Sequence, residues 1–241
     1  MTDRRPDRSQ VATPGEDAAW SSLRDRLVIS LRPIGAPTAV GFLGLAAATL
    51  TVSGVQLGWI PPEQSRQAAL AVVGFAFLAQ LLAGVFSLLA RDGTAATAMI
   101  TLALTWLVVG LVLYISEPGT ASAALGVFLL FAGTAMALTG ATAALGKLIP
   151  ATVFGVASLR FFATGGYHLS GADGWQTAAG VIGVVLFGLA MYAAWATELE
   201  DALGRTVLPL GRRGKARVAV TGSLLEQVRQ VVNEPGVRQQ L

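Results

Sequence analysis

The chain has 241 residues, of which 54% are apolar and 13% are charged, and its formal net charge is +3. This balance does not suit a water-soluble surface and predicts a protein embedded in a membrane. The absence of cysteine excludes disulfides, thiolate nucleophiles and cysteine-ligated metals. Basic residues gather in the two tails, which favours an anionic membrane face over nucleic acid, so we expect membrane lipid as a partner and no nucleic acid, metal or cofactor.

The first part of the chain, residues 1–36, is polar and lacks the continuous apolar core of a signal peptide, so we expect a retained cytoplasmic tail. Between Trp20 and Leu31, apolar residues recur at spacings of three and four, with charged residues on the other side. This pattern indicates a short helix that either lies in the membrane interface or packs under the membrane domain.

Six apolar blocks of similar size follow, and each is long enough to cross a hydrocarbon core of about 30 Å. Short turn-rich connections separate them, such as Arg91-Asp92-Gly93 and Glu117-Pro118-Gly119. The sequence therefore predicts an all-α polytopic membrane protein with six transmembrane helices in one bundle, over residues 37–197. The blocks run approximately from Thr38 to Leu57, Ala68 to Ala90, Ala95 to Ile115, Ala121 to Leu145, Ile149 to Tyr167 and Trp175 to Ala196.

The orientation follows from the positions of lysine and arginine. The two tails hold six and seven basic residues and the second and fourth loops hold one each, whereas the odd loops hold only Arg66. This distribution predicts that both termini are cytoplasmic. Aromatic rings that prefer the membrane interface then fall near its outer side at Trp59, Tyr114, Tyr167 and Trp175, and near its inner side at Tyr192 and Trp195.

Glycines mark where helices approach closely. In the fourth block Gly126, Gly133 and Gly140 repeat every seven residues, and Gly180 with Gly183 forms a similar face in the sixth. Such faces are typical of backbone contact between membrane helices. The alternative is that glycine is simply frequent in these helices.

Polar side chains within the blocks are the candidates for a substrate path, because they are costly at membrane depth unless they face a bundle interior or a wet path. Gln80 and Ser87 share one face of the second block, and Thr97, Thr101 and Thr105 are spaced by four along the third. An amide and hydroxyl groups can replace part of the hydration of a small carboxylate. Alternatively, the hydroxyl groups bond back to their own helix.

Arg160 is the one formal charge predicted within a block. Its long stem could carry the guanidinium to the membrane surface, or the guanidinium could attract an anion toward a path. His168 lies at the predicted outer end of the fifth block, where it could respond to external pH or serve as an interfacial side chain with no special task.

The last segment, residues 198–241, is predicted to be a basic cytoplasmic tail. Ser223 and Glu226 have capping-box spacing and begin a short helix that Pro235 ends, which could contact a partner, a second copy or the lipid surface. Enzymatic activity is not expected, because the blocks lack a serine with a histidine or lysine base, paired aspartates or a metal cluster. We expect Glu198, Glu200 and Asp201, together with Arg205, to fix the end of the sixth helix.

Several segments also resemble a known family. Residues Gly204 to Gly211 read GRTVLPLG, and Ala79 to Gly84 read AQLLAG, followed by Thr97-Ala98 and Trp106. Further matching positions are Leu125 to Phe128, Gly180, Gly183 and Tyr192. From about Pro33 to Gly211 the chain resembles the acetate and succinate permeases, also called the acetate uptake transporter family.

The resemblance implies a six-span protein of the bacterial plasma membrane, with both ends inside, that carries acetate or succinate as a homo-oligomer, a hexamer. It implies an apolar constriction at Phe42, with Leu102 as its third-span partner, and it gives Arg205 and Pro209 a structural role. The substrate path predicted from the residues and the resemblance together comprises Phe42, Gln80, Ser87, Thr97, Thr101, Leu102 and Trp106, with Arg160 as a site of anion attraction. Protons are a further expected partner if transport is a symport.

The chain departs from the family pattern at defined positions. The first-span motif Asn-Pro-Ala-Pro-Leu-Gly-Leu is largely replaced between Arg32 and Phe42, Ser87 stands where the family has a glutamate, and Leu102 replaces a pore tyrosine. The family offers no arginine that matches Arg160. We therefore expect a passive or proton-linked carrier or channel for small carboxylates, with a non-transporting membrane sensor or assembly protein of the same fold as the alternative.

Overall fold

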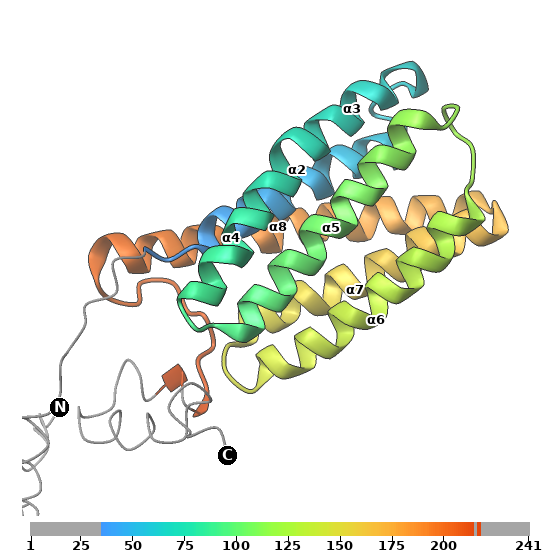
Figure 1. Ribbon diagram of the computed structural model, residues 1–241. Helices are drawn as coiled ribbons and strands as arrows, with labels where there is room; N and C mark the ends of the chain where they lie inside the picture. Colours follow the sequence, from blue (N-terminus) through green and yellow to red (C-terminus); the bar gives the residue numbers. More distant parts are fainter. Residues whose placement is uncertain (1–34, 215, 218–241) are drawn as a thin grey trace, which may run out of the picture. The chain divides into compact units, whose positions relative to one another are not determined.

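The computed structural model describes residues 35–214, 216 and 217 (Figure 1). The predicted helices at Trp20–Leu31 and after Ser223 lie outside the described residues. The elements, in chain order, are α2 (Thr38–Gln56), the 3-10 turn η1 (Pro62–Gln64), α3 (Ser65–Ala71), the π-helical segment η2 (Val72–Phe77), α4 (Leu78–Leu89), α5 (Gly93–Ile115), α6 (Ala123–Ala144), α7 (Leu148–Ser170) and α8 (Asp173–Leu203).

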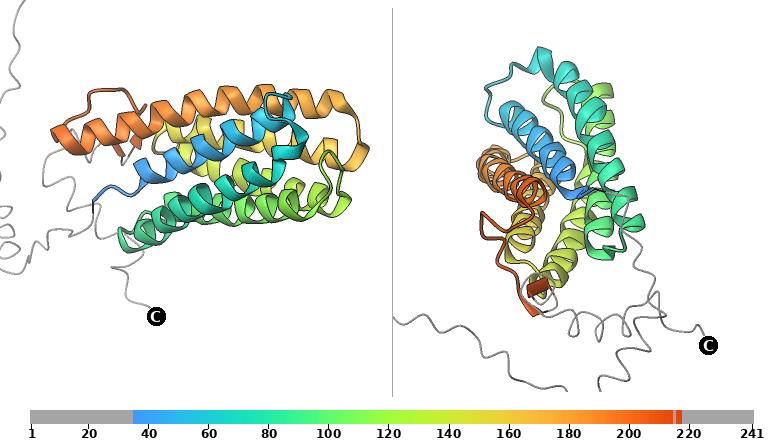
Figure 2. Two further views of the ribbon diagram at one scale, coloured as in Figure 1. Left: turned by 90° about the horizontal axis from the view of Figure 1, so that it is seen from above. Right: turned by 90° about the vertical axis from the view of Figure 1, so that its left-hand side faces the viewer.

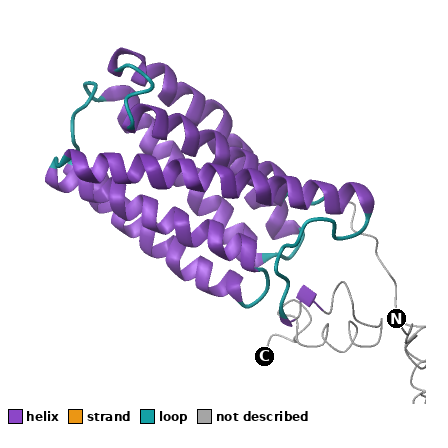
Figure 3. Ribbon diagram, turned by 180° about the vertical axis from the view of Figure 1, so that it is seen from behind, coloured by secondary structure: helices purple, strands orange, loops and turns teal. Residues whose placement is uncertain are grey.

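Six of these helical stretches are long and apolar enough to cross a membrane, counting η1, α3, η2 and α4 as one stretch from Pro62 to Leu89. They pack side by side as one bundle (Figure 2), and the connections between them lie at the two ends of the bundle (Figure 3). The predicted all-α fold with six membrane helices is therefore confirmed.

Local chemistry fixes where the helices begin and end. The side chain of Asp92 accepts a hydrogen bond from the Ala95 amide at 3.0 Å and begins α5, and Ser122 does the same for α6. Glycine ends α8, because Gly204 has φ 61°, which residues with a Cβ rarely adopt. The sixth helix is longer than predicted and runs through Leu203, since the polar turn around Glu200 is compatible with a helix and nothing interrupts it before Gly204.

The predicted glycine face of the fourth span is a close helix contact. The Cβ that Gly133 lacks would lie 2.9 Å from the Phe162 ring on α7, and that of Gly140 would lie 3.3 Å from the Ala151 carbonyl oxygen. Gly126 meets Leu169 of α7 in the same way. The expectation of backbone contact is therefore confirmed, and the contact lies between α6 and α7 of one chain.

Replacing Gly133 with leucine is expected to destabilise the protein by about 1 to 3 kcal/mol, because the new side chain overpacks against Phe162. The measurement is thermal unfolding of the purified protein in detergent, with Gly188→Leu as the control, since no atom lies within 4 Å of the added Cβ at Gly188. Equal melting temperatures for the two variants would contradict the contact.

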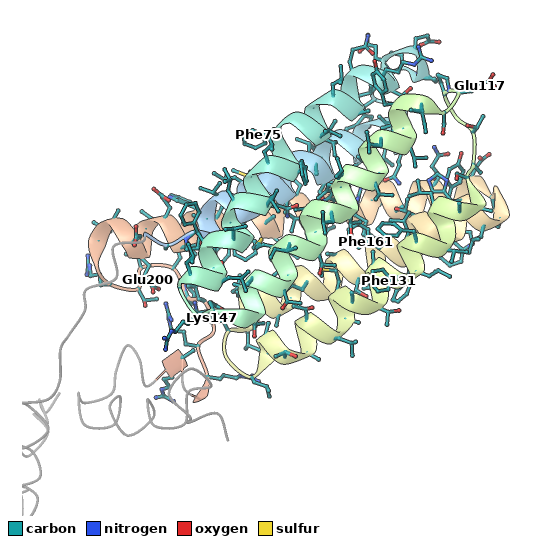
Figure 4. All side chains as sticks on the ribbon, viewed as in Figure 1. Phe75, Glu117, Phe131, Lys147, Phe161 and Glu200 are labelled. Atoms are coloured by element: carbon teal, nitrogen blue, oxygen red, sulfur yellow. The ribbon has the colours of Figure 1, made fainter. Side chains whose placement is uncertain are left out.

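Apolar side chains fill the interior and also cover the outside of the bundle. Phe161 is buried among the helices, whereas Phe75 and Phe131 are exposed and point away from them (Figure 4). Exposed rings also occur at the ends of the helices, at Trp59 and Trp175 near one end and Trp195 near the other. An apolar outer surface with rings at both ends is typical of a protein that spans a bilayer.

Candidate functional site

The deepest polar group of the second span is Gln80 on α4. Its side chain is 0% exposed, and among the described residues neither its Oε1 nor its Nε2 has a hydrogen-bond partner. The Gln80 side chain packs against Gly44 of α2, whose missing Cβ would lie 3.0 Å from Gln80 Cγ. Because buried polar groups are almost always paired in proteins, this amide is available to a guest molecule.

Unpartnered hydroxyl groups accompany this amide on the same two helices. Thr49 and Ser53 of α2 and Ser87 of α4 are buried, and their hydroxyl oxygens have no partner in the described part of the chain. These three residues together with Gln80 are called the polar row below. Ser87 and Gln80 are among the predicted path residues, whereas Thr49 and Ser53 are not.

The signal for the α2 members is present in the sequence. Thr49, Ser53 and Gln56 follow one another at spacings of four and three, which places three polar side chains on one stripe of a helix. That stripe faces the interior, since Thr49 and Ser53 are buried and Gln56 reaches α7 with a hydrogen bond from Nε2 to Thr164 Oγ1 at 3.2 Å.

The two residues expected at an apolar constriction both lie in the core. Phe42 is 2% exposed and Leu102 is 0% exposed, and both belong to the central cluster of buried apolar side chains. Phe42 also stacks on Phe154 of α7, with ring centroids 6.2 Å apart and an interplanar angle of 27°. The aromatic partner on the fifth span was not predicted.

The threonines of α5 do not all face the interior. Thr101 is half-buried, whereas Thr97 is exposed. Thr97 therefore does not face the interior of the bundle, contrary to the expectation that it lines a path there. The reason is the helix register, which turns Ala96 and Met99 inward and Thr97 outward. Thr105 is buried, and its hydroxyl group donates a hydrogen bond to the Thr101 carbonyl at 2.7 Å. This is the alternative in which a hydroxyl group bonds back to its own helix.

Arg160 lies near the middle of α7 and is 1% exposed, so its guanidinium does not reach the membrane surface. Its Nη2 donates a hydrogen bond to Gln56 Oε1 at 3.2 Å. Its Cζ lies 5.2 Å from the centroid of the Trp106 ring, and Trp106 in turn packs on Phe161. Trp106 is fully buried, and its indole nitrogen has no partner among the described residues.

His168 has a structural contact at the end of α7. Its Nδ1 accepts a hydrogen bond from the backbone N–H of Ser122 at 3.1 Å, just before α6 begins, and its ring packs against Tyr167. The imidazole therefore ties the start of α6 to the end of α7. Within residues 35–214, no cluster of three or more histidine, aspartate or glutamate side chains could hold a metal ion.

The segment that follows α8 closes the bundle at the opposite end. The carbonyl oxygens of Leu210 and Gly211 accept hydrogen bonds from the amides of Ile149 and Leu148, at 3.2 and 3.1 Å. These two amides belong to the first turn of α7, where an amide finds no carbonyl acceptor within its own helix. The GRTVLPLG segment thus supplies a backbone cap for the fifth span.

Side chains hold this closing segment in place. Glu200 of α8 forms an ion pair with Arg212 and accepts a hydrogen bond from Thr206, while the Tyr192 hydroxyl donates to the Pro209 carbonyl at 3.0 Å. Glu200 thus does fix the end of the sixth helix, but its partner is Arg212, whereas Arg205 is exposed.

Lys147, just before α7, lies at the same end of the bundle as Glu200 (Figure 4). Burial, and then the nearby charge of Arg212, lower the pKa of the Lys147 ammonium below its usual value. The charges of Asp92 and Glu200 act in the opposite direction. This end of the bundle is therefore a packed charged network.

Six apolar helices around buried polar side chains, several of which have atoms without a hydrogen-bond partner among the described residues, define an integral helical membrane protein. Its fold is that of the bacterial acetate channel SatP, to which the chain is similar with a TM-score of 0.67 and 22% sequence identity, over 74% of this chain and 99% of that one. No protein-family model matches the sequence, and no curated protein sequence matches it. The similarity confirms the fold that the resemblance to the acetate permeases implies.

Proposed function

We propose that this protein is a membrane channel or transporter for small carboxylates such as acetate. The observation that carries the proposal is the fold similarity, which covers 99% of the length of an acetate channel. The interior agrees with it, because Gln80 offers a buried amide with no partner in the described part of the chain. An amide of this kind replaces part of the hydration that a carboxylate loses on entering the membrane.

The proposed path runs along α2, from Phe42 past Gln80 and toward the C-terminal end of the helix. Gly41 packs on Ala83 and Gly44 on Gln80, so the amide lies beside α2 just beyond Phe42. Thr49 and Ser53 follow along the same helix. Phe42 and Leu102, both buried in the core, are the proposed apolar collar of this path, and a passing carboxylate requires Phe42 to move off Phe154.

A passive path fits the charge distribution better than a proton-linked one. The acidic side chains of the described residues lie in the loops or at helix ends, as Asp92, Asp173 and Glu200 do. None of them reaches the depth of Gln80 along a span. A proton-coupled cycle would therefore lack a carboxylate near the collar to carry the proton.

We also propose a location in the bacterial plasma membrane, as a homo-oligomer, a hexamer by analogy with the permease family, with both termini in the cytoplasm. The basic tails support this orientation. Reporter fusions at the two ends of the chain should therefore give the same cytoplasmic signal. A C-terminus accessible from outside intact cells would contradict the orientation.

The proposed function is tested by uptake of labelled acetate, succinate and longer acids into vesicles that contain the purified protein, with and without a pH gradient. Acetate should enter faster than into protein-free vesicles, and the gradient should add no more than it adds to protein-free vesicles. Failure of every carboxylate to enter faster than into empty vesicles would reject transport.

The second candidate is a non-transporting membrane sensor or assembly protein of the same fold. Two observations favour it: Ser87 stands in place of the family glutamate, and Phe42 and Leu102 are both buried in the apolar core. The same uptake experiment separates the two candidates, because the second one predicts no flux at any acid concentration.

A further inference from the structure

The Arg160 guanidinium is a charge that the proposed path past Gln80 does not use. In the part of the chain that the structure describes, its side chain donates one hydrogen bond, to the neutral Gln56 amide, and no ion pair involves it. A single unpaired cation at the middle of a membrane span is costly and points to a function.

Two neighbouring residues, Gln56 and Trp106, and the end of α2 compensate part of this charge. Gln56 Oε1 accepts a hydrogen bond from Arg160, and Gln56 is the last residue of α2, where the helix dipole is negative. The Trp106 ring lies beneath the guanidinium, with its centroid 5.2 Å from Cζ, in a cation–π arrangement. These partial charges offset part of the cost of burying the guanidinium, but among the described residues they supply no counter-ion.

Further hydrogen-bond donors converge on the same place. Arg160 Nε and Ser53 Oγ are both buried without a partner among the described residues, and both lie next to Gly183 of α8. A Cβ at Gly183 would be 2.6 Å from Arg160 Nε and still closer to Ser53 Oγ, so only glycine lets both donors approach α8. The Trp106 ring lies against this guanidinium, and its indole N–H is also buried without a partner among the described residues.

We propose that Arg160, Ser53 and Trp106 form an anion site inside the helical bundle, beside the C-terminal end of α2, which binds the carboxylate group of the transported acid. This inference rests on the proposed function. Guanidinium groups pair with carboxylates through two parallel N–H···O bonds, and an anion here would satisfy donors that are otherwise orphaned. Gln56 keeps its Nε2 hydrogen bond to Thr164 when Arg160 turns toward such a ligand.

The geometry also defines the class of acid. Ser53 lies nine residues beyond Gly44 on α2, so the site is roughly 13 Å along the helix from Gln80. One guanidinium neutralises one carboxylate, and a second carboxylate at this depth would be buried without a cation. The site therefore selects monocarboxylates over dicarboxylates such as succinate.

The test compares wild-type protein with Arg160→Gln and Arg160→Lys in vesicles, using labelled acetate and its uncharged isostere acetamide. Arg66→Gln is the control, because it removes the same charge from an exposed position. In Arg160→Gln, acetate flux should fall about tenfold to a hundredfold while acetamide flux stays unchanged. Arg160→Lys should keep part of the acetate flux, and wild-type protein should prefer acetate to succinate.

A binding measurement separates this inference from the proposed function. Sodium acetate, but not acetamide, should raise the melting temperature of the wild-type protein and of Arg66→Gln, and it should have no such effect on Arg160→Gln. If the wild-type protein shows this shift in melting temperature but no acetate flux, the anion site is supported and the proposed transport is rejected. Equal acetate flux and equal acetate-dependent melting in wild type and Arg160→Gln would overturn the site, as would an equal loss of acetate and acetamide flux.

Discussion

Replacing Gln80 with leucine is expected to lower acetate flux about tenfold, because the substitution removes the buried amide that offsets the lost hydration of the anion. Trimming the collar should have the opposite effect. Phe42→Ala or Leu102→Ala widens and wets the constriction, which raises leak or admits longer acids. The measurement is uptake into vesicles with equal amounts of each purified variant.

The opposite signs make this experiment informative. General destabilisation would lower flux in all three variants, whereas a path through the collar and the amide predicts one loss and two gains. Gln67→Leu is the matched control, because it changes the same residue type at an exposed position of α3 and should leave flux unchanged. A parallel fall in all three variants, or no change for any acid, would reject the assignment of the path.

The second large effect is expected at Gly183, where α8 meets α2 and α7. Gly183→Ala should destabilise the protein by about 1 to 3 kcal/mol, because the added methyl group displaces Ser53 and Arg160. It should also remove the acetate-dependent rise in melting temperature. Gly188→Ala is the control on the same helix, since its added Cβ meets no atom within 4 Å.

A double variant identifies the cause. Ser53→Ala removes the hydroxyl group that lies nearest to the added Cβ, so Gly183→Ala combined with Ser53→Ala should be more stable than the sum of the single effects predicts. Additive effects in thermal unfolding would show that the methyl group is accommodated elsewhere. The acetate-dependent shift should stay absent in the double variant, because one donor of the site is gone.

Much of the fold could be predicted because it depends on local chemistry. A membrane helix satisfies its own backbone, so apolar length alone identified the six spans. Glycine spacing identified the α6 face that packs on α7. The end of α8 was placed too early at Ala196, because charge was taken as the limit of the span, although Glu198 to Leu203 continue the helix until Gly204.

The candidate site was only half predictable because it depends on distant contacts. Polarity within an apolar block was enough to select Gln80 and Arg160. The state of Arg160 was left open, since its hydrogen-bond partner Gln56 lies 104 positions away in the chain. The outward position of Thr97 depends on the rotation of α5 against its neighbours, which spacing along one helix does not fix.

The backbone cap on α7 has a consequence for the order in which the protein is built. During synthesis the N-terminal part of the chain is made first. The Leu148 and Ile149 amides therefore cannot form their hydrogen bonds to Gly211 and Leu210 until the whole of α8 has been made. The first turn of the fifth span is therefore capped only after the sixth span has been made. It also follows that a shortened variant tolerates removal of the chain after Arg213 better than a cut at Gly204, which would leave the first turn of α7 uncapped.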